Sequence, residues 1–194
     1  MMMLRNLMLL CLGLVLAGCD RPHWNGFNLT GVSWGKEFRL ADTEGRERTL
    51  AEFRGRPVLL FFGFVQCAEV CPTSLVRAAE VKKRLAADGA QLQIILITVD
   101  PERDTPALLR DYAAVFDPEL LALRGDEAAT RKAAEEFRVF YQKVPTGTSY
   151  TVDHTALTYV FDPEGNLRLG EPHHLTIEQV TQDLQQLLKA KSNS

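Results

Sequence analysis

Two short, continuous apolar runs with one helical segment between them constrain the fold of this chain more than any other feature. The runs are VLLFFGF, residues 58–64, and LQIILITVD, residues 92–100. Short runs rich in β-branched and aromatic residues and bounded by turn or loop signals predict strands that are buried on both faces. Residues 73–88 continue as a helix after Pro72, which suits a first helical position. Strand, helix and strand in this order predict a βαβ unit in an α/β domain.

The rest of the chain continues the alternation of strands and helices. We expect paired strands in 38–50 around Thr43-Glu44-Gly45, a helical turn in 50–57, helices over 105–116, 126–144 and 176–190, a strand over 120–125, and a strand hairpin over 154–170. This order implies a mostly parallel sheet to which the last hairpin adds antiparallel strands. The pattern is typical of a thioredoxin-like α/β domain, a central mixed sheet flanked by helices with an N-terminal hairpin.

The first twenty residues have the layout of a bacterial export signal. Arg5 supplies a positive charge, and residues 7–16 form an apolar run of ten, too short to span a bilayer as a mature helix. The small residues before Cys19 resemble the bacterial lipoprotein cleavage box, in which the cysteine becomes the lipid-bearing first residue. Asp20 after it marks retention at the inner membrane in some bacteria. We therefore expect a lipid anchor at Cys19; an ordinary secretory signal is the alternative.

Cleavage before Cys19 would separate a signal peptide from a mature chain that has a tether, one domain and a short tail. We expect a lipoprotein signal peptide in 1–18, a membrane tether in 19–34, one thioredoxin-like domain in 35–190 and a disordered tail in 191–194. Without Arg5 the chain has 21 basic and 25 acidic residues. This mild negative balance gives no support for a nucleic-acid partner or a polybasic membrane patch. All four methionines leave with the signal peptide, which excludes a thioether-rich copper site.

Cys67 and Cys71 lie between the first buried run and the helix after Pro72. They therefore follow the carboxyl end of a predicted strand, and open α/β sheets bind ligands at this edge of the sheet. Unpaired N–H groups at the start of a helix also lower the pKa of a nearby thiol. Metal ligation and redox attack both need that thiolate. Three intervening residues, instead of the two of thioredoxin-type motifs, favour a metal but permit a reversible disulfide, which an oxidising compartment also favours. Two buried structural thiols are the third interpretation.

A third metal ligand would have to come from the histidines. Two thiolates favour Cu(I), and an imidazole suits copper in both oxidation states. His154, in TVDHTALTYVFDP at the expected start of a strand, is the strongest candidate, although histidines at strand entrances are often only surface residues. His23 lies in the tether, and we interpret His173 and His174 as solvated, with a weak secondary metal site as the alternative. The sequence offers no fourth ligand at zinc-like spacing.

Three segments in order, LAEFRGRPVLLFFGFVQCAEVCPTSL, ILITVDPERDTPALLRDY and TVDHTALTYVFDPEGNL, resemble the Sco/SenC proteins. These are membrane-tethered, thioredoxin-like copper proteins that assist assembly of the binuclear copper centre of cytochrome c oxidase. The resemblance runs from Trp34 to the final helix. It implies that Cys67, Cys71 and His154 bind copper as Cu(I) and Cu(II). The chain has Gln66-Cys67-Ala68 where many members have His-Cys-Pro, and neither changed position is a ligand in the family pattern.

Acidic residues near these positions could support the ligands. Asp100 and Asp104 occur in VDPERDTP, close to the end of the second buried run, and Asp153 precedes His154. Asp104 could add negative charge near the site, but we interpret it as the N-terminal cap of the helix that starts at Pro106. Asp100 and Asp153 are candidates for groups that orient His154 or an axial contact.

The resemblance implies a metallochaperone rather than an enzyme, lipid-anchored to the inner membrane of a bacterium and facing the periplasm. Its partners would be the copper-centre subunit of cytochrome c oxidase and other periplasmic proteins that donate copper. The alternative is a membrane-anchored thiol–disulfide oxidoreductase that keeps the oxidase subunit's cysteines reduced through a redox-active Cys67–Cys71 disulfide. Only the first function needs His154. A purely structural lipoprotein would not explain the three-residue constellation.

Overall fold

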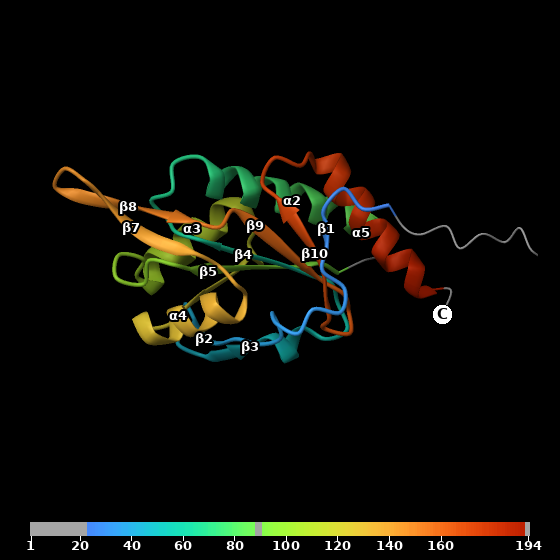
Figure 1. Cartoon of the computed structure of the whole chain (residues 1–194), viewed down its shortest axis with the longest axis horizontal. Helices are drawn as coiled ribbons and strands as arrows, with labels where there is room; N and C mark the ends of the chain where they lie inside the picture. The colour runs from blue at the N-terminus through green and yellow to red at the C-terminus, as the bar shows by residue number, and fades with distance from the viewer. Residues whose placement is uncertain (1–22, 88–90, 193–194) are drawn as a thin grey trace, which may run out of the picture.

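A computed structural model of the chain describes residues 23–87 and 91–192. They form one eight-stranded sheet in the order β1-β10-β9-β4-β5-β6-β2-β3, and a separate β7–β8 hairpin. Figure 1 shows α2, α3 and α5 on one face of the sheet and α4 on the other. The strands are β1 Phe27–Asn28, β2 Arg39–Asp42, β3 Glu47–Thr49, β4 Val58–Gly63, β5 Gln93–Thr98, β6 Leu121–Arg124, β7 Tyr141–Thr146, β8 Ser149–His154, β9 Leu157–Phe161 and β10 Leu167–Pro172. The helices are η1 Leu50–Phe53, α2 Val70–Ala87, α3 Pro106–Phe116, α4 Glu127–Glu136 and α5 Ile177–Ser192.

The two apolar runs form the centre of the core, as predicted. Every residue of β4 and β5 is buried, and the two strands pair in parallel from Val58↔Gln93 to Gly63↔Thr98. Strand β6 extends this parallel unit on the other side of β5. The thioredoxin-like mixed α/β fold is therefore confirmed.

The expectation of a mostly parallel sheet is wrong. Of the seven strand pairings that the described residues make in the large sheet, two are parallel and five antiparallel. A parallel connection needs a crossover such as α2 or α3, whereas tight turns join β2 to β3 and β9 to β10. Both hairpins enter the main sheet, β2 beside β6 and β9 beside β4, so antiparallel pairs predominate.

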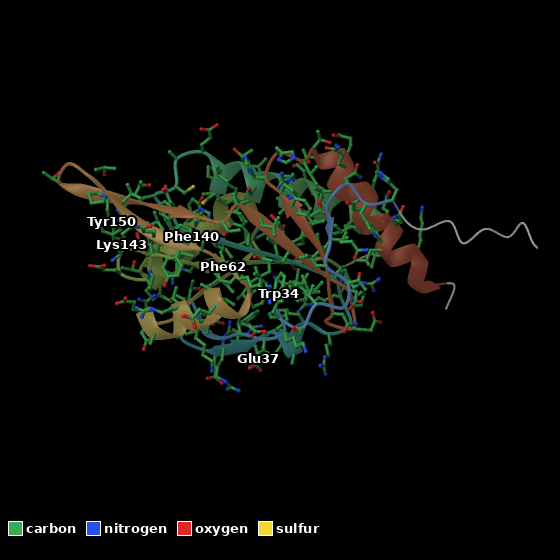
Figure 2. All side chains as sticks on the ribbon, viewed as in Figure 1. Trp34, Glu37, Phe62, Phe140, Lys143 and Tyr150 are labelled. Atoms are coloured by element: carbon green, nitrogen blue, oxygen red, sulfur yellow. The ribbon has the colours of Figure 1, made fainter. Side chains whose placement is uncertain are left out.

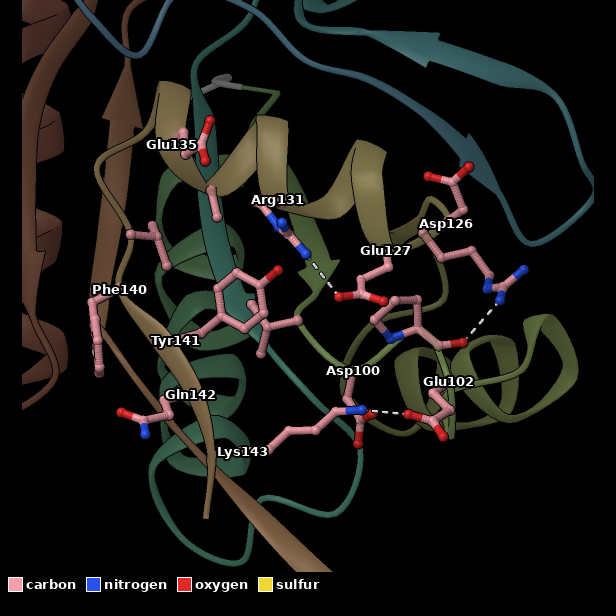
Figure 3. A pocket seen from close by; sticks show the side chains of 15 residues that line it. Asp100, Glu102, Asp126, Glu127, Arg131, Glu135, Phe140, Tyr141, Gln142 and Lys143 are labelled. Atoms are coloured by element: carbon pink, nitrogen blue, oxygen red, sulfur yellow. Dashed lines mark hydrogen bonds and ion pairs between the residues drawn. The ribbon is translucent and has the colours of Figure 1, made fainter.

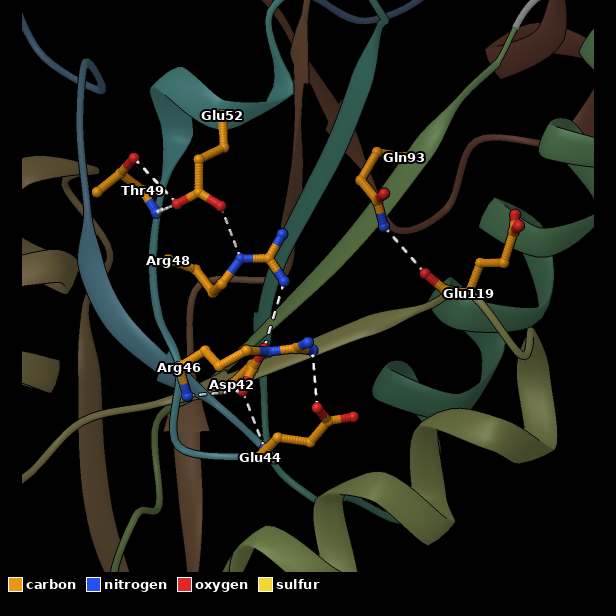
Figure 4. A network of polar contacts seen from close by, with 8 residues as sticks. All are labelled: Asp42, Glu44, Arg46, Arg48, Thr49, Glu52, Gln93 and Glu119. Atoms are coloured by element: carbon orange, nitrogen blue, oxygen red, sulfur yellow. Dashed lines mark hydrogen bonds and ion pairs between the residues drawn. The ribbon is translucent and has the colours of Figure 1, made fainter.

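The turn between β2 and β3 lies where the sequence predicts it (Figure 4). The buried Asp42 carboxylate accepts hydrogen bonds from the backbone N–H groups of Glu44 and Arg46 at 2.9 and 3.0 Å. It also accepts bonds from the side chains of Arg46 and Arg48, whose charges compensate the buried anion. Gly45 has a φ of 83°, which favours glycine at this turn position.

The helix expected over 126–144 is wrong in its second half, because α4 ends at Glu136. The Glu136 carbonyl accepts a bond from the backbone N–H of Gly35 at 2.9 Å, so a distant segment caps the helix. Phe137 is buried in the core, and Arg138 then adopts a φ of 54°, which reverses the chain without a glycine. Nothing local in the sequence indicates this end.

The residues after this turn form the β7–β8 hairpin, which the sequence analysis does not predict. The strands pair from Tyr141↔His154 to Thr146↔Ser149 around a turn that contains Gly147. In Figure 1 the tip of the hairpin extends beyond the main sheet on the left. His154 is therefore the last residue of β8, at the base of this hairpin, and the predicted 154–170 hairpin begins instead at Leu157 in β9.

The N-terminal segment contacts the domain before residue 35. Strand β1 pairs with β10, and the backbone N–H groups of Asn25 and Gly26 donate to the Asp183 carboxylate on α5 at distances of 2.9–3.1 Å. The signal peptide, Cys19 and residues 20–22 lie outside the described residues, so the lipid anchor and the membrane tether stay predictions. Helix α5 reaches Ser192 and thus includes the first two residues of the expected disordered tail. None of the helices in the described part of the chain is long and apolar enough to span a membrane.

Candidate metal centre

Cys67, Cys71 and His154 come together at the end of β4. Their candidate ligand atoms, two sulfurs and one imidazole nitrogen, all lie within 4.8 Å of one another. Two ligand atoms that each lie about 2.3 Å from one ion can be at most about 4.6 Å apart, so small side-chain rotations suffice for a shared ion. Among residues 23–87 and 91–192 no second group of this kind occurs, and both His173 and His174 are exposed.

The cysteine loop leads directly into α2. The helix begins at Val70, two residues before the expected position, so that Cys71 lies in its first turn and Pro72 is the third helical residue. Proline is tolerated there because the first N–H groups of a helix have no intrahelical acceptor. Cys67 is half-buried and Cys71 fully buried, and both thiols are free. The backbone N–H of Cys71 points to Cys67 Sγ at 3.3 Å.

Hydrogen bonds make the two thiols unequal. The pKa of Cys67 is well below its ordinary value, mainly because the Cys71 thiol donates to its sulfur, with further contributions from His154 and from the backbone N–H groups of Cys71 and Glu69. The pKa of Cys71 is raised because its proton is held by Cys67 and because the side chain is buried. Without metal the pair therefore contains one thiolate, on the more accessible sulfur.

His154 is held with Nε2 toward the cysteines. Its Nε2 lies 3.4 Å from Cys71 Sγ, and its Nδ1 lies 3.2 Å from the Thr155 carbonyl oxygen. A proton on Nδ1 can be donated to that carbonyl, which leaves the Nε2 lone pair for a metal. The imidazole also makes edge-to-face contacts with the buried rings of Phe61 and Phe64, at centroid distances of 5.9 and 5.8 Å.

Sequence reasoning does not identify the three residues that hold this imidazole. Phe61 and Phe64 lie within the apolar run that precedes the cysteines, and this proximity is the one signal that could have indicated them. The Thr155 carbonyl belongs to the backbone and has no sequence signal.

Neither of the two carboxylates expected to orient His154 hydrogen-bonds to it among the described residues. Asp153 is exposed on β8, opposite Gln142. Asp100 is fully buried, but its carboxylate accepts bonds from the Tyr150 hydroxyl at 2.8 Å and from Arg103 Nε at 2.5 Å. The carbonyl of Thr155 occupies the position that we expected a carboxylate to take.

Asp104 supports the cysteine loop instead of capping a helix, so that interpretation is wrong. The cap of α3 is Thr105, whose side chain accepts a bond from the Leu108 N–H. Asp104 is fully buried, and its Oδ2 accepts bonds from the Val65 N–H at 3.1 Å and from the Thr98 hydroxyl at 2.6 Å. Burial raises the pKa of this carboxyl. These bonds fix the chain two residues before Cys67.

A comparison with family models identifies the family of this chain. A model described as SCO1/SenC matches residues 29–189. The chain belongs to the SCO1/SenC family. The mitochondrial SCO2 homolog of Bos taurus is 35% identical over 158 residues, which cover 79% of this chain and 59% of the relative. The chain thus spans less than two thirds of that relative's length.

Solved structures of Sco proteins are also similar to this chain. ScoI of Bradyrhizobium japonicum, with copper bound, is 41% identical with a TM-score of 0.71, over 79% of this chain and 99% of that one. Apo Sco1 of Thermus thermophilus is 37% identical with a TM-score of 0.76, over 87% of this chain and 99% of that one.

This SCO1/SenC domain also has a hollow of about 620 Å³ beside the base of the hairpin (Figure 3). Its wall comes from α4, from residues 99–102 and from the start of β7. Ion pairs between Lys143 and Glu102 and between Arg131 and Glu127 lie along it. The two cysteines and His154 do not line this hollow, so the candidate metal centre is a separate site on the described surface.

Proposed function

We propose that this SCO1/SenC protein binds one copper ion through Cys67, Cys71 and His154 and helps to assemble the binuclear copper centre of cytochrome c oxidase. The observation that carries the proposal is the convergence of two sulfurs and one imidazole nitrogen within 4.8 Å. Thiolates prefer Cu(I), while the imidazole retains affinity for Cu(II). The copper bound to a Sco structure that is 41% identical supports the choice of metal.

The unequal thiols suggest the order of events when copper arrives. The half-buried Cys67 thiolate receives the ion first. Cys71 then loses its proton as it binds, and His154 Nε2 completes the ligand set. Because Cys71 must release a proton, copper affinity falls at acid pH. A partner's thiolates would take the ion by replacing the two cysteines one at a time, so the accessible Cys67 is the natural exit point.

The proposed setting is the bacterial cell envelope. The signal layout of residues 1–18 and the cleavage box before Cys19 support a lipid anchor in the inner membrane, with the domain facing the periplasm. A copper donor and the copper-centre subunit of the oxidase would meet the domain there.

One observation favours a second function, thiol–disulfide exchange. Cys67 has the lowered pKa and partial exposure of an attacking thiolate, and Cys71 is close enough in sequence to complete a disulfide. In that function the domain would reduce the cysteines of the oxidase subunit. An oriented imidazole is not needed for this chemistry, so the contribution of His154 distinguishes the two functions.

The first prediction concerns this contribution. We expect the reduced, exported chain, purified in detergent, to bind one Cu(I) tightly in anaerobic competition with a chelator. Cys67→Ser/Cys71→Ser should abolish binding because both thiolates are lost, and His154→Ala should weaken it by about tenfold or more. His174→Ala is the matched control, since this exposed histidine lies outside the site. Weak binding that is indifferent to His154 would contradict the copper proposal and favour the reductase.

A further inference from the structure

The proposed ligands come from two structural elements that share no backbone ladder. Cys67 lies in the β4–α2 connection and Cys71 in the first turn of α2, whereas His154 ends the β7–β8 hairpin. Within the part of the chain that the structure describes, this hairpin forms its own two-stranded sheet and pairs with no strand of the large sheet. His154 is joined to the large sheet by the chain that enters β9 at Leu157, but the rest of the hairpin depends on side-chain contacts to keep its place beside the cysteine loop.

We propose that Arg103 is a positioning residue that locks the β7–β8 hairpin to the cysteine loop and thereby sets the place of His154. Arg103 lies in the loop that joins the end of β5 to the start of α3. The proposal rests on the copper site proposed above, but the attachment of the hairpin can be measured without copper.

One guanidinium group contacts both elements. Arg103 Nη1 donates to the Tyr150 carbonyl in β8 at 2.7 Å and to Gln66 Oε1 at 2.9 Å. Its central carbon also lies 3.7 Å from the centroid of the Tyr150 ring, a close cation–π contact. Gln66 is adjacent to Cys67, and Tyr150 is four residues before His154 on the same strand. Figure 2 labels Tyr150, which lies next to the tip of the hairpin, and Lys143, whose Nζ lies 4.8 Å from the Tyr150 ring centroid.

Asp100 holds this arginine in place. Its buried carboxylate accepts from Arg103 Nε through one oxygen and from the Tyr150 hydroxyl through the other, at 2.5 and 2.8 Å. The Thr98 hydroxyl accepts a bond from the Asp100 backbone N–H at 3.0 Å, so the network is attached to the end of β5. The Arg103 side chain is 16% exposed and that of Asp100 is 1% exposed. Charge-assisted bonds shielded from water in this way are strong and directional.

The chemistry of arginine explains why this residue can link the parts. A planar guanidinium has five donors in fixed directions and can stack on a ring while it bonds at its edge. A lysine at position 103 would keep the charge but lose the stacking and most of the bonds. The Gln66 side chain is uncharged, so the link to the cysteine loop is a hydrogen bond to a neutral amide oxygen.

The test combines three measurements on the exported chain. In the metal-free protein, Arg103→Ala should speed amide hydrogen exchange in β7 and β8 but leave β4 and β5 unchanged. Cu(I) affinity should then fall by about tenfold or more when His154 is present. It should fall less than about twofold in a His154→Ala background, because a positioning residue acts only through its ligand. The Cu(II) form of Arg103→Ala should also lose the imidazole-nitrogen coupling in its electron paramagnetic resonance spectrum.

Two matched variants complete the design. Arg103→Lys should behave like Arg103→Ala, because charge alone does not make the link. Arg131→Ala, which removes an exposed arginine paired with Glu127 on α4, should match the wild type in all three measurements.

The outcomes separate the two proposals. Unchanged exchange in β7 and β8, or an equal affinity loss with and without His154, would overturn the role of Arg103. Faster exchange confined to the hairpin in a protein that binds no copper would support the link and reject the copper function.

Discussion

At the scale of single residues, the cysteine site depends on space as much as on its ligands. A Cβ atom added at Gly63 would lie 2.7 Å from the Phe61 ring and 3.0 Å from Cys71 Sγ. The backbone of Gly63 is not in the left-handed region, so the requirement here is volume and not conformation. Only glycine at position 63 therefore leaves room for Cys71 and for the Phe61 ring, which contacts His154.

We expect Gly63→Ala to displace Cys71 or Phe61 and to cost about 1–3 kcal/mol of unfolding free energy through overpacking. Cu(I) affinity should fall with it, because both groups belong to the candidate site. Urea unfolding of the metal-free protein and chelator competition measure the two effects. Val76→Ala, a change at an exposed position of α2, is the control. Wild-type stability together with wild-type affinity would show that the site tolerates the added methyl group.

At the scale of elements, contacts between distant segments decide where helices and strands end. Helix α4 stops at Glu136, where Gly35 caps its last carbonyl. Arg138 then turns the chain, with its guanidinium 5.1 Å from the Trp34 ring centroid. The same N-terminal segment is attached to α5 through Asp183, which is 1% exposed. The segment before β2 thus determines where α4 ends, and it is also attached to α5.

Asp183→Ala should loosen this attachment first. The change leaves the N–H groups of Asn25 and Gly26 without their acceptor, at a cost of about 1–3 kcal/mol. Amide hydrogen exchange should rise in β1 well before it rises in β4, because β1 is a two-residue strand at the edge of the sheet and β4 is a buried central strand. Asp111→Ala removes an exposed carboxylate of α3 and should leave both regions unchanged. Uniform exchange across β1 and β4 would instead indicate a global loss of stability.

At the scale of the whole molecule, one buried carboxyl links the pH to the stability of the fold. Glu171 in β10 is fully buried. Its carboxylate packs so closely against Gly26 that a Cβ atom added there would lie 2.6 Å from Oε2. Burial first, and then Asp183 on α5, raises the pKa of Glu171 to about 8, although Arg77 on α2 lowers it. The folded state therefore keeps a proton that the unfolded state, with an ordinary value of 4.5, releases.

This pKa predicts the direction of a pH effect. Between pH 4.5 and about pH 8 the folded state binds more protons at Glu171, so the contribution of this group to stability falls as the pH rises. Cys67 acts in the opposite direction over this range, because its lowered pKa favours the folded state as the pH rises. Both cysteines are therefore replaced by serine in the measurement.

In that background, urea unfolding should show that Glu171→Gln removes a negative slope of at most about 1.4 kcal/mol per pH unit. The difference between the two proteins should grow from pH 5 to pH 8. Identical pH profiles would show that Glu171 is not protonated in the folded domain.

Much of this architecture could be predicted because its signals are local. The apolar runs of β4 and β5, the turn at Gly45 and the proline after Cys71 each depend on neighbouring residues. The hairpin β7–β8 could not be predicted, because the helical pattern of 126–136 continues to Val144 without a local stop signal. The role of Asp104 could not be predicted for a similar reason. The two groups that donate hydrogen bonds to its carboxylate, the Val65 N–H and the Thr98 hydroxyl, come from the cysteine loop and from β5.

By itself, the sequence determined the central βαβ unit, the reactive position of Cys67 and Cys71 and the choice of His154 as the strongest candidate for a third ligand. Side-chain period and helix-start chemistry act over a few residues, so they can be recognised without a fold. The tertiary structure alone decided that His154, 83 residues from Cys71, lies 3.4 Å from its sulfur. It also decided that Thr155, Phe61, Phe64 and Arg103 hold that imidazole and its hairpin. Such contacts exist only after the sheet has brought distant segments together, because no local pattern records which of them will meet.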